Sequence, residues 1–178
     1  MKISTNTSKV QRAAFRSNDS ASNARGYALR LLGIRGRSES ELRERLKRKG
    51  FKKDTIDATI LALKEFGLVD DPALAGDLIS FAVNRKKLGM RGVKALLQKR
   101  GIPEDIINSS GIDTIDETTG AEELVRKKIK LFKGLPKEKV KRRLYGMLQR
   151  RGHCAETIKR VLDGAMEGGR TWSDGVVE

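Results

Sequence analysis

The chain repeats itself with a period of 51 residues. Glycines stand at positions 50, 101 and 152, and each follows two aliphatic residues, eight and four positions earlier. An isoleucine stands six positions after each glycine. Residues four apart share one face of a helix, and a fixed period of this length is typical of stacked helical units. The residues that share these positions are Leu42, Val93 and Leu144; Leu46, Leu97 and Leu148; and Ile56, Ile107 and Ile158.

Helix boundary signals agree with this period. Ser38 and Glu41 form a capping box, in which the serine oxygen accepts from the amide three residues later. Gly50 suits the left-handed conformation that ends a helix. Asp54 is a candidate N-cap for the next helix, and Thr119 with Glu122 offers a second capping box.

The second unit opens at Asp70-Asp71-Pro72, where a carboxylate and then proline favour a helix start. Its Gly89-Met90-Arg91-Gly92 segment predicts a turn. The chain is therefore predicted to be all-α, with about nine helices in three tandem three-helix repeats. The predicted segments are a disordered basic tail (1–22), repeat 1 (23–67), repeat 2 (68–110), a linker (111–120), repeat 3 (121–167) and a C-terminal tail (168–178).

The charge balance favours a polyanionic partner. The 178 residues include 38 basic and 23 acidic side chains, a net charge of +15. Such a balance attracts nucleic acid or an acidic protein surface. Aromatic residues make up 4% of the chain, so phosphate contact is favoured over base stacking. A solvated basic surface without a partner is the alternative for any single run, and the basic N-terminal tail is open to the same two interpretations.

No pattern indicates catalysis or a cofactor. His153 and Cys154 are the only histidine and cysteine, whereas a zinc site needs about four ligands and a cysteine nucleophile needs a separate base. Asp70 and Asp71 are explained by helix capping. One cysteine excludes an internal disulfide and predicts a reducing compartment. Without a signal-peptide pattern or a long apolar run, we expect a cytoplasmic monomer that does not associate with membranes.

Three groups of residues match a known family in combination. They are Ser38-Glu39-Ser40-Glu41-Leu42 with Leu46, Lys49 and Gly50; Gly67-Leu68-Val69-Asp70-Asp71-Pro72-Ala73-Leu74-Ala75; and Arg85, Gly89, Gly92 and Lys99-Arg100-Gly101-Ile102. No single motif is specific, but three repeats occur in the family's order, and residues 24–167 thus resemble the RecX family of bacterial RecA regulators. His153 departs from the pattern, because Phe51 and Ile102 hold the equivalent positions.

The resemblance implies a regulator without enzymatic activity that binds the RecA filament on single-stranded DNA. Such a protein is expected to form an elongated, curved array of repeats and to limit filament growth, ATP hydrolysis, strand exchange and coprotease activity. A sequence-independent DNA-binding protein that acts through phosphate contacts is the alternative. The residues we expect to contact RecA or DNA are Arg43, Lys47, Arg85, Lys94, Lys99, Arg142 and Arg143.

Overall fold

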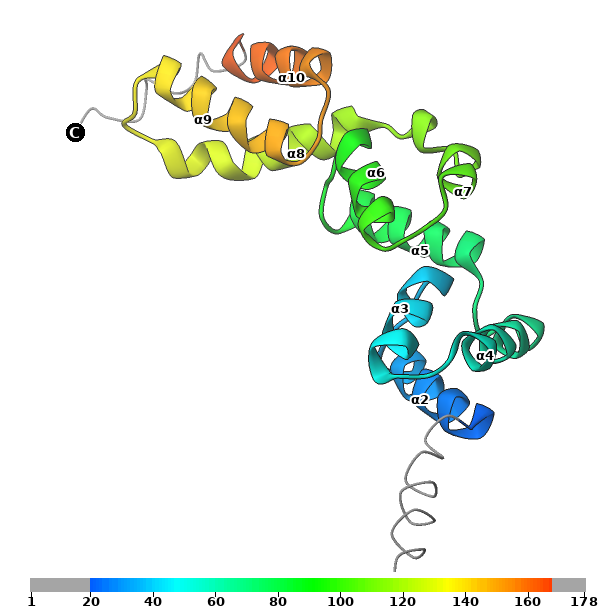
Figure 1. Ribbon diagram of the computed structural model, residues 1–178. Helices are drawn as coiled ribbons and strands as arrows, with labels where there is room; N and C mark the ends of the chain where they lie inside the picture. The colour runs from blue at the N-terminus through cyan, green and yellow to red at the C-terminus, as the bar shows by residue number, and fades with distance from the viewer. Residues whose placement is uncertain (1–19, 168–178) are drawn as a thin grey trace, which may run out of the picture. The chain divides into compact units, whose positions relative to one another are not determined.

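The structure, a computed structural model, describes residues 20–167, and its regular elements in that range are all helical (Figure 1). This confirms the all-α prediction. No helix in the described range is long and apolar enough to cross a membrane. The helices are α2 (Ala21–Ile34), α3 (Glu39–Lys49), α4 (Lys53–Glu65), α5 (Asp71–Asn84), α6 (Met90–Lys99), α7 (Glu104–Ser109), α8 (Glu117–Ile129), α9 (Lys137–Arg150) and α10 (Ala155–Glu167), with short 3-10 helices η2 (Ile112–Thr114) and η3 (Lys130–Phe132).

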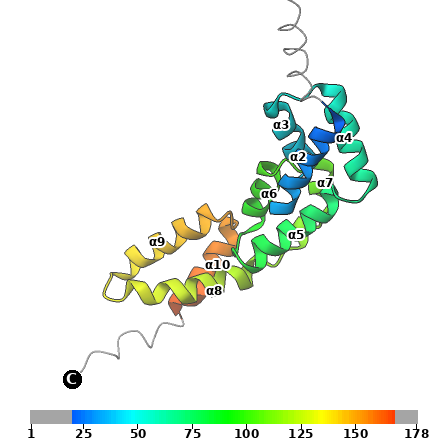
Figure 2. The same ribbon diagram turned by 90° about the horizontal axis from the view of Figure 1, so that it is seen from below.

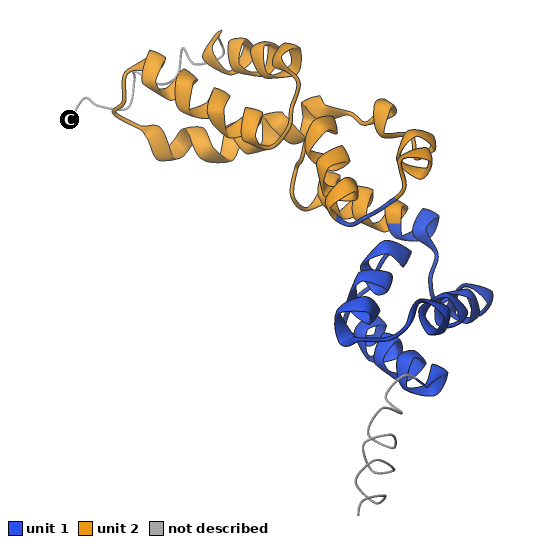
Figure 3. Ribbon diagram, in the orientation of Figure 1, with its two compact units in different colours: residues 1–74, 100–102 blue, residues 75–99, 103–178 orange. Residues whose placement is uncertain are grey.

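The helices belong to two compact units (Figure 3). Unit 1 contains the described residues up to Leu74 together with Arg100–Ile102, and unit 2 contains Ala75–Lys99 and the described residues from Pro103. The predicted tail at 168–178 lies outside the described residues, as does the tail at 1–22 except for residues 20–22. Ser20 is the N-cap of α2, since its side chain accepts a hydrogen bond from the amide of Asn23, and residues 21 and 22 lie in the first turn of that helix.

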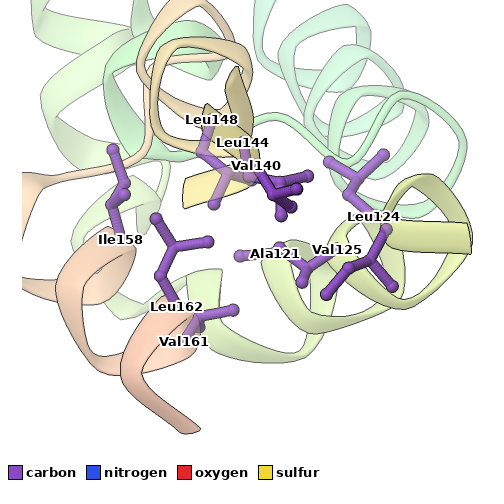
Figure 4. Close-up of a cluster of buried hydrophobic side chains, with 10 residues drawn as sticks. Ala121, Leu124, Val125, Val140, Leu144, Leu148, Ile158, Val161 and Leu162 are labelled. Carbon is purple, nitrogen blue, oxygen red and sulfur yellow. The ribbon is translucent and has the colours of Figure 1, made fainter. Parts of the chain in front are cut away.

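The aliphatic residues of the 51-residue period form the cores. Leu42, Leu46, Val93, Leu97, Leu144 and Leu148 are all fully buried, and the three isoleucines are at most 6% exposed. In unit 1, α2, α3 and α4 pack around one apolar cluster. In unit 2, α8, α9 and α10 contact one another around another, and Figures 1 and 2 show these three helices side by side. Figure 4 shows aliphatic side chains of the three helices directed into a common centre.

Three of the predicted helix caps are present and two are absent. Asp70, predicted to cap the helix that starts before Pro72, accepts from the amide of Ala73 at 2.8 Å. The Ser38 side chain accepts from the amide of Glu41 at 3.0 Å, and Gly50 ends α3 with a φ of 94°. The prediction for Asp54 is wrong, because it lies in the first turn of α4 and Lys52 is the N-cap.

The prediction for Thr119 is also wrong, because Asp116 caps α8 by accepting from the amide of Thr118. Helix α8 therefore begins at Glu117, inside the segment predicted as a linker. Residues Ile112–Thr114 of that segment form η2.

The sequence predicted that Gly92 belongs to a connecting turn. In the structure it lies instead in the first helical turn of α6. Within unit 2, the backbone of Arg151 and Gly152 crosses the start of this helix. The amide of Gly89 donates to the carbonyl of Arg151, and the amide of Arg91 donates to that of Gly152, both at 3.1 Å. A Cβ atom at Gly92 would overlap the Arg151 carbonyl oxygen. Glycine is required here because two backbones are in contact.

Gly92→Ala is expected to destabilise the protein by about 1–3 kcal/mol, since the added methyl group forces the two backbones apart. Gly76→Ala is the matched control, because its Cβ would meet nothing within 4 Å in the middle of α5. That control should stabilise the helix by about 0.5–1 kcal/mol. Urea denaturation followed by circular dichroism measures both effects, and equal midpoints for the two variants would contradict the crossing.

Candidate functional site

Several basic residues of unit 1 are paired with carboxylates of the same unit. Glu41, at the start of α3, pairs with Arg35 at 2.9 Å and with Arg100 at 3.0 Å. Glu39 pairs with Arg43 at 2.7 Å and with Lys64 at 2.9 Å. Arg43 also pairs with Asp57. The high lysine and arginine content of this unit therefore overstates the charge that it offers to a partner.

These contacts shift the titration of the carboxylates in the expected directions. Burial raises the pKa of Glu41, but hydrogen bonds from Arg35 and Arg100 outweigh it, and the net shift is downward. Hydrogen bonds from Lys64 and Arg43 hold the pKa of Glu39 below its ordinary value. Both carboxylates are therefore ionised at neutral pH, and the network persists there.

His153, Cys154 and Glu117 meet in unit 2, but their contacts are structural. Glu117 is 7% exposed, and its carboxylate accepts from the amides of Met90 and Cys154, the latter at 3.1 Å. His153 is 2% exposed, and its Nε2 lies 3.1 Å from the Lys87 carbonyl oxygen. Within residues 20–167, no group of three or more histidine, cysteine or acidic side chains is placed to hold a metal ion.

The environment of this cluster fixes its protonation. Burial raises the pKa of Glu117, but the backbone hydrogen bonds from Cys154 and Met90 outweigh it and lower the pKa overall. Burial lowers the pKa of His153, so the imidazole is neutral at neutral pH. A neutral imidazole that carries its proton on Nε2 can donate to the carbonyl of Lys87. Together with Glu117, which accepts from the amides of Met90 and Cys154, this contact joins the start of α6 to the start of α10.

Among residues 20–167, the third repeat has more lysines and arginines without a carboxylate partner than the rest of that range. Fourteen lysines and arginines lie between residues 121 and 160. Of these, only Lys141 forms an ion pair within the described part of the chain, with Asp163 at 2.9 Å. The outer face of α9 also has a shallow, open hollow of about 390 Å³, lined by Glu138, Lys139, Lys141, Arg142 and Tyr145. Excess positive charge beside an open surface is suited to binding an extended polyanion.

The predicted contact residues fall into two groups. The first group is exposed and has no carboxylate partner among the described residues; it consists of Lys47, Arg85, Lys99, Arg142 and Arg143. Of these, Arg143 lies over the ring of Phe132. Arg43 is engaged by Glu39 and Asp57, as described above, and Lys94 pairs with Glu104 at 2.6 Å.

A helical spacing of four residues could have indicated the Glu39–Arg43 pair from sequence. The Lys94–Glu104 pair joins two helices and has no such local signal.

Comparisons with known proteins give a consistent result. Residues 24–63 match the family described as RecX, first three-helix domain, and residues 116–162 match RecX, third three-helix domain. A regulatory protein RecX from Chlorobaculum tepidum is 33% identical over 141 residues, which cover 79% of this chain and 87% of that protein. One from Mycolicibacterium vanbaalenii is 40% identical over 139 residues, covering 73% of this chain and 75% of that protein.

The fold is also similar to that of a solved structure. The crystal structure of RecX from Lactobacillus salivarius has a TM-score of 0.72 to this chain at 20% sequence identity. The match covers 85% of this chain and 99% of the other. At this level of identity the match concerns the fold, and it agrees with tandem three-helix repeats.

Glu41→Gln is expected to destabilise the protein by about 1–3 kcal/mol at neutral pH, because it weakens two charge-assisted contacts of a largely buried carboxylate. Since the folded state lowers the pKa of Glu41, this stabilisation is present above the unfolded pKa and is lost as the pH falls through the folded one. The difference in stability between wild type and variant should therefore begin to shrink below about pH 4, near the unfolded pKa, and disappear once the pH is below the folded pKa. Urea midpoints across the pH range measure this.

Glu44→Gln on the same helix is the control. The Glu44 pair with Arg48 is well exposed, with side chains 58% and 68% accessible, and such pairs contribute less than about 1 kcal/mol. A loss in this control as large as in Glu41→Gln would contradict the importance of burial at Glu41.

Proposed function

The chain belongs to the RecX family of regulatory proteins, and we propose that it inhibits the RecA recombinase by binding the RecA filament on single-stranded DNA. In this proposal it limits filament growth and thereby reduces ATP hydrolysis, strand exchange and coprotease activity. It acts by binding and not by catalysis, as a monomer in the cytoplasm. The relatives share the name of a regulator, and the mechanism is our inference from the surface of this chain.

The observation that carries the proposal is the set of unpaired cations on the third repeat. The partner in this proposal contains DNA phosphates, and exposed lysines and arginines are complementary to that negative charge. Each exposed contact is individually weak, so binding requires many of them at once. Among the described residues, thirteen of the fourteen lysines and arginines at 121–160 have no carboxylate partner, which supplies many such contacts. Two of them, Arg151 and Arg160, donate instead to the Lys86 carbonyl and the Thr118 hydroxyl.

The seven predicted contact residues are not equivalent, and of them only Arg142 and Arg143 lie on the third repeat. Lys47, Arg85, Lys99, Arg142 and Arg143 can approach an acidic ligand without first breaking an ion pair. Arg43 and Lys94 must exchange Asp57 and Glu104, respectively, for the ligand. Such an exchange recovers little free energy, so we assign the main contribution to the first group.

Sequence-independent DNA binding is the second candidate function, favoured by the same unpaired cations. Phosphate contacts would release counterions, so affinity for bare DNA would fall steeply with salt. A filament-directed regulator would instead bind the assembled filament more tightly than bare DNA or free RecA.

DNA-dependent ATP hydrolysis by RecA, titrated with this protein at two salt concentrations, separates the two candidates. Coverage of the DNA is measured in parallel by fluorescence anisotropy. We expect inhibition at amounts too small to coat the DNA. Inhibition only when the DNA is saturated would support the DNA-binding candidate and contradict a filament-directed mechanism.

The double variant Lys99→Glu and Arg142→Glu should weaken inhibition of RecA by at least about tenfold, since several contacts become repulsive. The matched control is Arg25→Glu with Arg30→Glu on α2, which changes the net charge equally on exposed positions outside the candidate surface. The control should inhibit like the wild type. Equal losses in both variants would show that bulk charge, and not this surface, determines inhibition.

A further inference from the structure

A groove between α8 and α10 is open on the surface of the third repeat. These two helices pack directly on each other, and the hollow between them has a volume of about 460 Å³. Its described lining comes from α8, from Lys130 directly after α8, and from α10. None of it comes from α9, so the groove lies on the side of the helix pair that α9 does not cover. A groove between two packed helices is a surface on which a further helix can pack.

The floor of the groove is apolar. Val125 on α8 and Val161 on α10 line it, and both belong to the core cluster of the repeat. Ile129 and Ala165 line it as well, the first within that cluster and the second packed against it. Apolar side chains placed in the groove would therefore extend the core and leave water.

Gly164 forms part of the wall of the groove without any packing reason of its own. It is exposed in the interior of α10, and a Cβ atom there would meet nothing within 4 Å. Glycine is less favourable than alanine inside a helix, so the described chain gives no reason for it at this position. A missing side chain does, however, allow the backbone of a partner to approach α10 closely.

The rim of the groove is basic. Arg126 and Lys130, four residues apart, line one side, and Arg160 on α10 lines the other. None of the three has a carboxylate partner among residues 20–167. Arg160 donates to the Thr118 hydroxyl and retains further N–H donors. Glu122 is the one carboxylate in the described lining. Three cations against one carboxylate favour an acidic partner.

We propose that the groove between α8 and α10 binds an acidic amphipathic helix of a partner protein. The apolar face of that helix packs on Val125 and Val161, its backbone passes close to Gly164, and its carboxylates face the basic rim. Nucleic acid would satisfy the cations but has no apolar face to cover the floor, so a peptide helix is the better fit. This inference goes beyond the proposed function, because it requires neither DNA nor RecA.

A model peptide tests binding to the full-length protein. The probe is a fluorescein-labelled peptide of about 15 residues, made of glutamate and alanine with leucines at helical spacings of three and four. A second peptide has serine in place of each leucine. Fluorescence anisotropy should show the leucine peptide binding at least about tenfold more tightly, since only its side chains cover the floor. Equal affinities would mean that the protein reads charge alone, and would overturn the proposal.

Filling the groove tests the location. Gly164→Leu places a side chain where the partner backbone passes, and should weaken binding of the leucine peptide at least about tenfold while helicity is retained. Gly76→Leu on α5 is the matched control, because Gly76 is also an exposed helical glycine whose Cβ would meet nothing within 4 Å. It does not line this groove and should bind the peptide like the wild type. Undiminished binding by a folded Gly164→Leu variant would overturn the site.

Charge reversal on α8 and directly after it tests the rim. Arg126→Glu with Lys130→Glu should weaken binding of the leucine peptide at least about tenfold, because attraction becomes repulsion. Lys127→Glu with Lys128→Glu changes the net charge equally at exposed positions that do not line the groove. That control should lose several-fold less. Equal losses would show that bulk charge determines binding and would overturn the role of the rim. Should Gly164→Leu fail to fold, this pair of variants still decides the location.

A thymidine oligonucleotide tests the other class of ligand. Phosphate contacts do not need the groove, so we expect Gly164→Leu to bind the oligonucleotide like the wild type. A loss as large as that for the leucine peptide would mean that nucleic acid occupies the groove, and would overturn the peptide proposal. These assays contain no RecA, so their failure is distinct from a failure of the proposed function in the ATP hydrolysis assay.

Discussion

In each unit, a carboxylate at the start of a helix, half-buried in unit 1 and buried in unit 2, holds distant parts of the chain together. In unit 1, Asp71 at the start of α5 accepts from the amide of Glu39, at 2.9 Å, where α3 begins. In unit 2, Glu117 at the start of α8 accepts from Met90, where α6 begins, and also from Cys154. The first amides of a helix have no partner within the helix, so the carboxylate satisfies a necessary bond and fixes the register of the packing. The leucines supply most of the burial, but these contacts specify which surfaces meet.

The repeat and its cores could be predicted from sequence, whereas these long-range caps could not. Aliphatic spacing and the glycine at each helix end are local signals, and the positions that they indicated are buried or in the left-handed conformation. The two amide donors, Glu39 and Met90, are 51 residues apart, as the period requires, but the two carboxylate acceptors, Asp71 and Glu117, are 46 residues apart. The 51-residue period therefore does not place the two acceptors at equivalent positions. The role of Gly92 was missed for a similar reason, since it depends on a backbone 59 residues later.

Net charge is a poor guide to which individual residues are available to a partner. A count over the sequence assigns similar importance to Arg43 and Arg142. In the structure, Arg43 lies between two carboxylates, while Arg142 has none among the described residues. Ion pairs within a helix have a spacing that can be recognised, but Asp57 reaches Arg43 from α4. Which cations remain available is decided by tertiary packing, and hence by the fold and not by composition.

The boundary between the two units has a consequence for engineering. Arg100–Ile102 belongs to unit 1, although the residues on both sides belong to unit 2. Arg100 donates to the carbonyl of Gly36, and Ser38 donates to that of Arg100. The second repeat is thus shared between units and is not a separable module. If the array is shortened, lengthened or recombined at the connections between repeats, unit 1 loses the packing of residues 100–102. An exchanged segment that contains unit 1 must therefore also include the turn formed by these three residues.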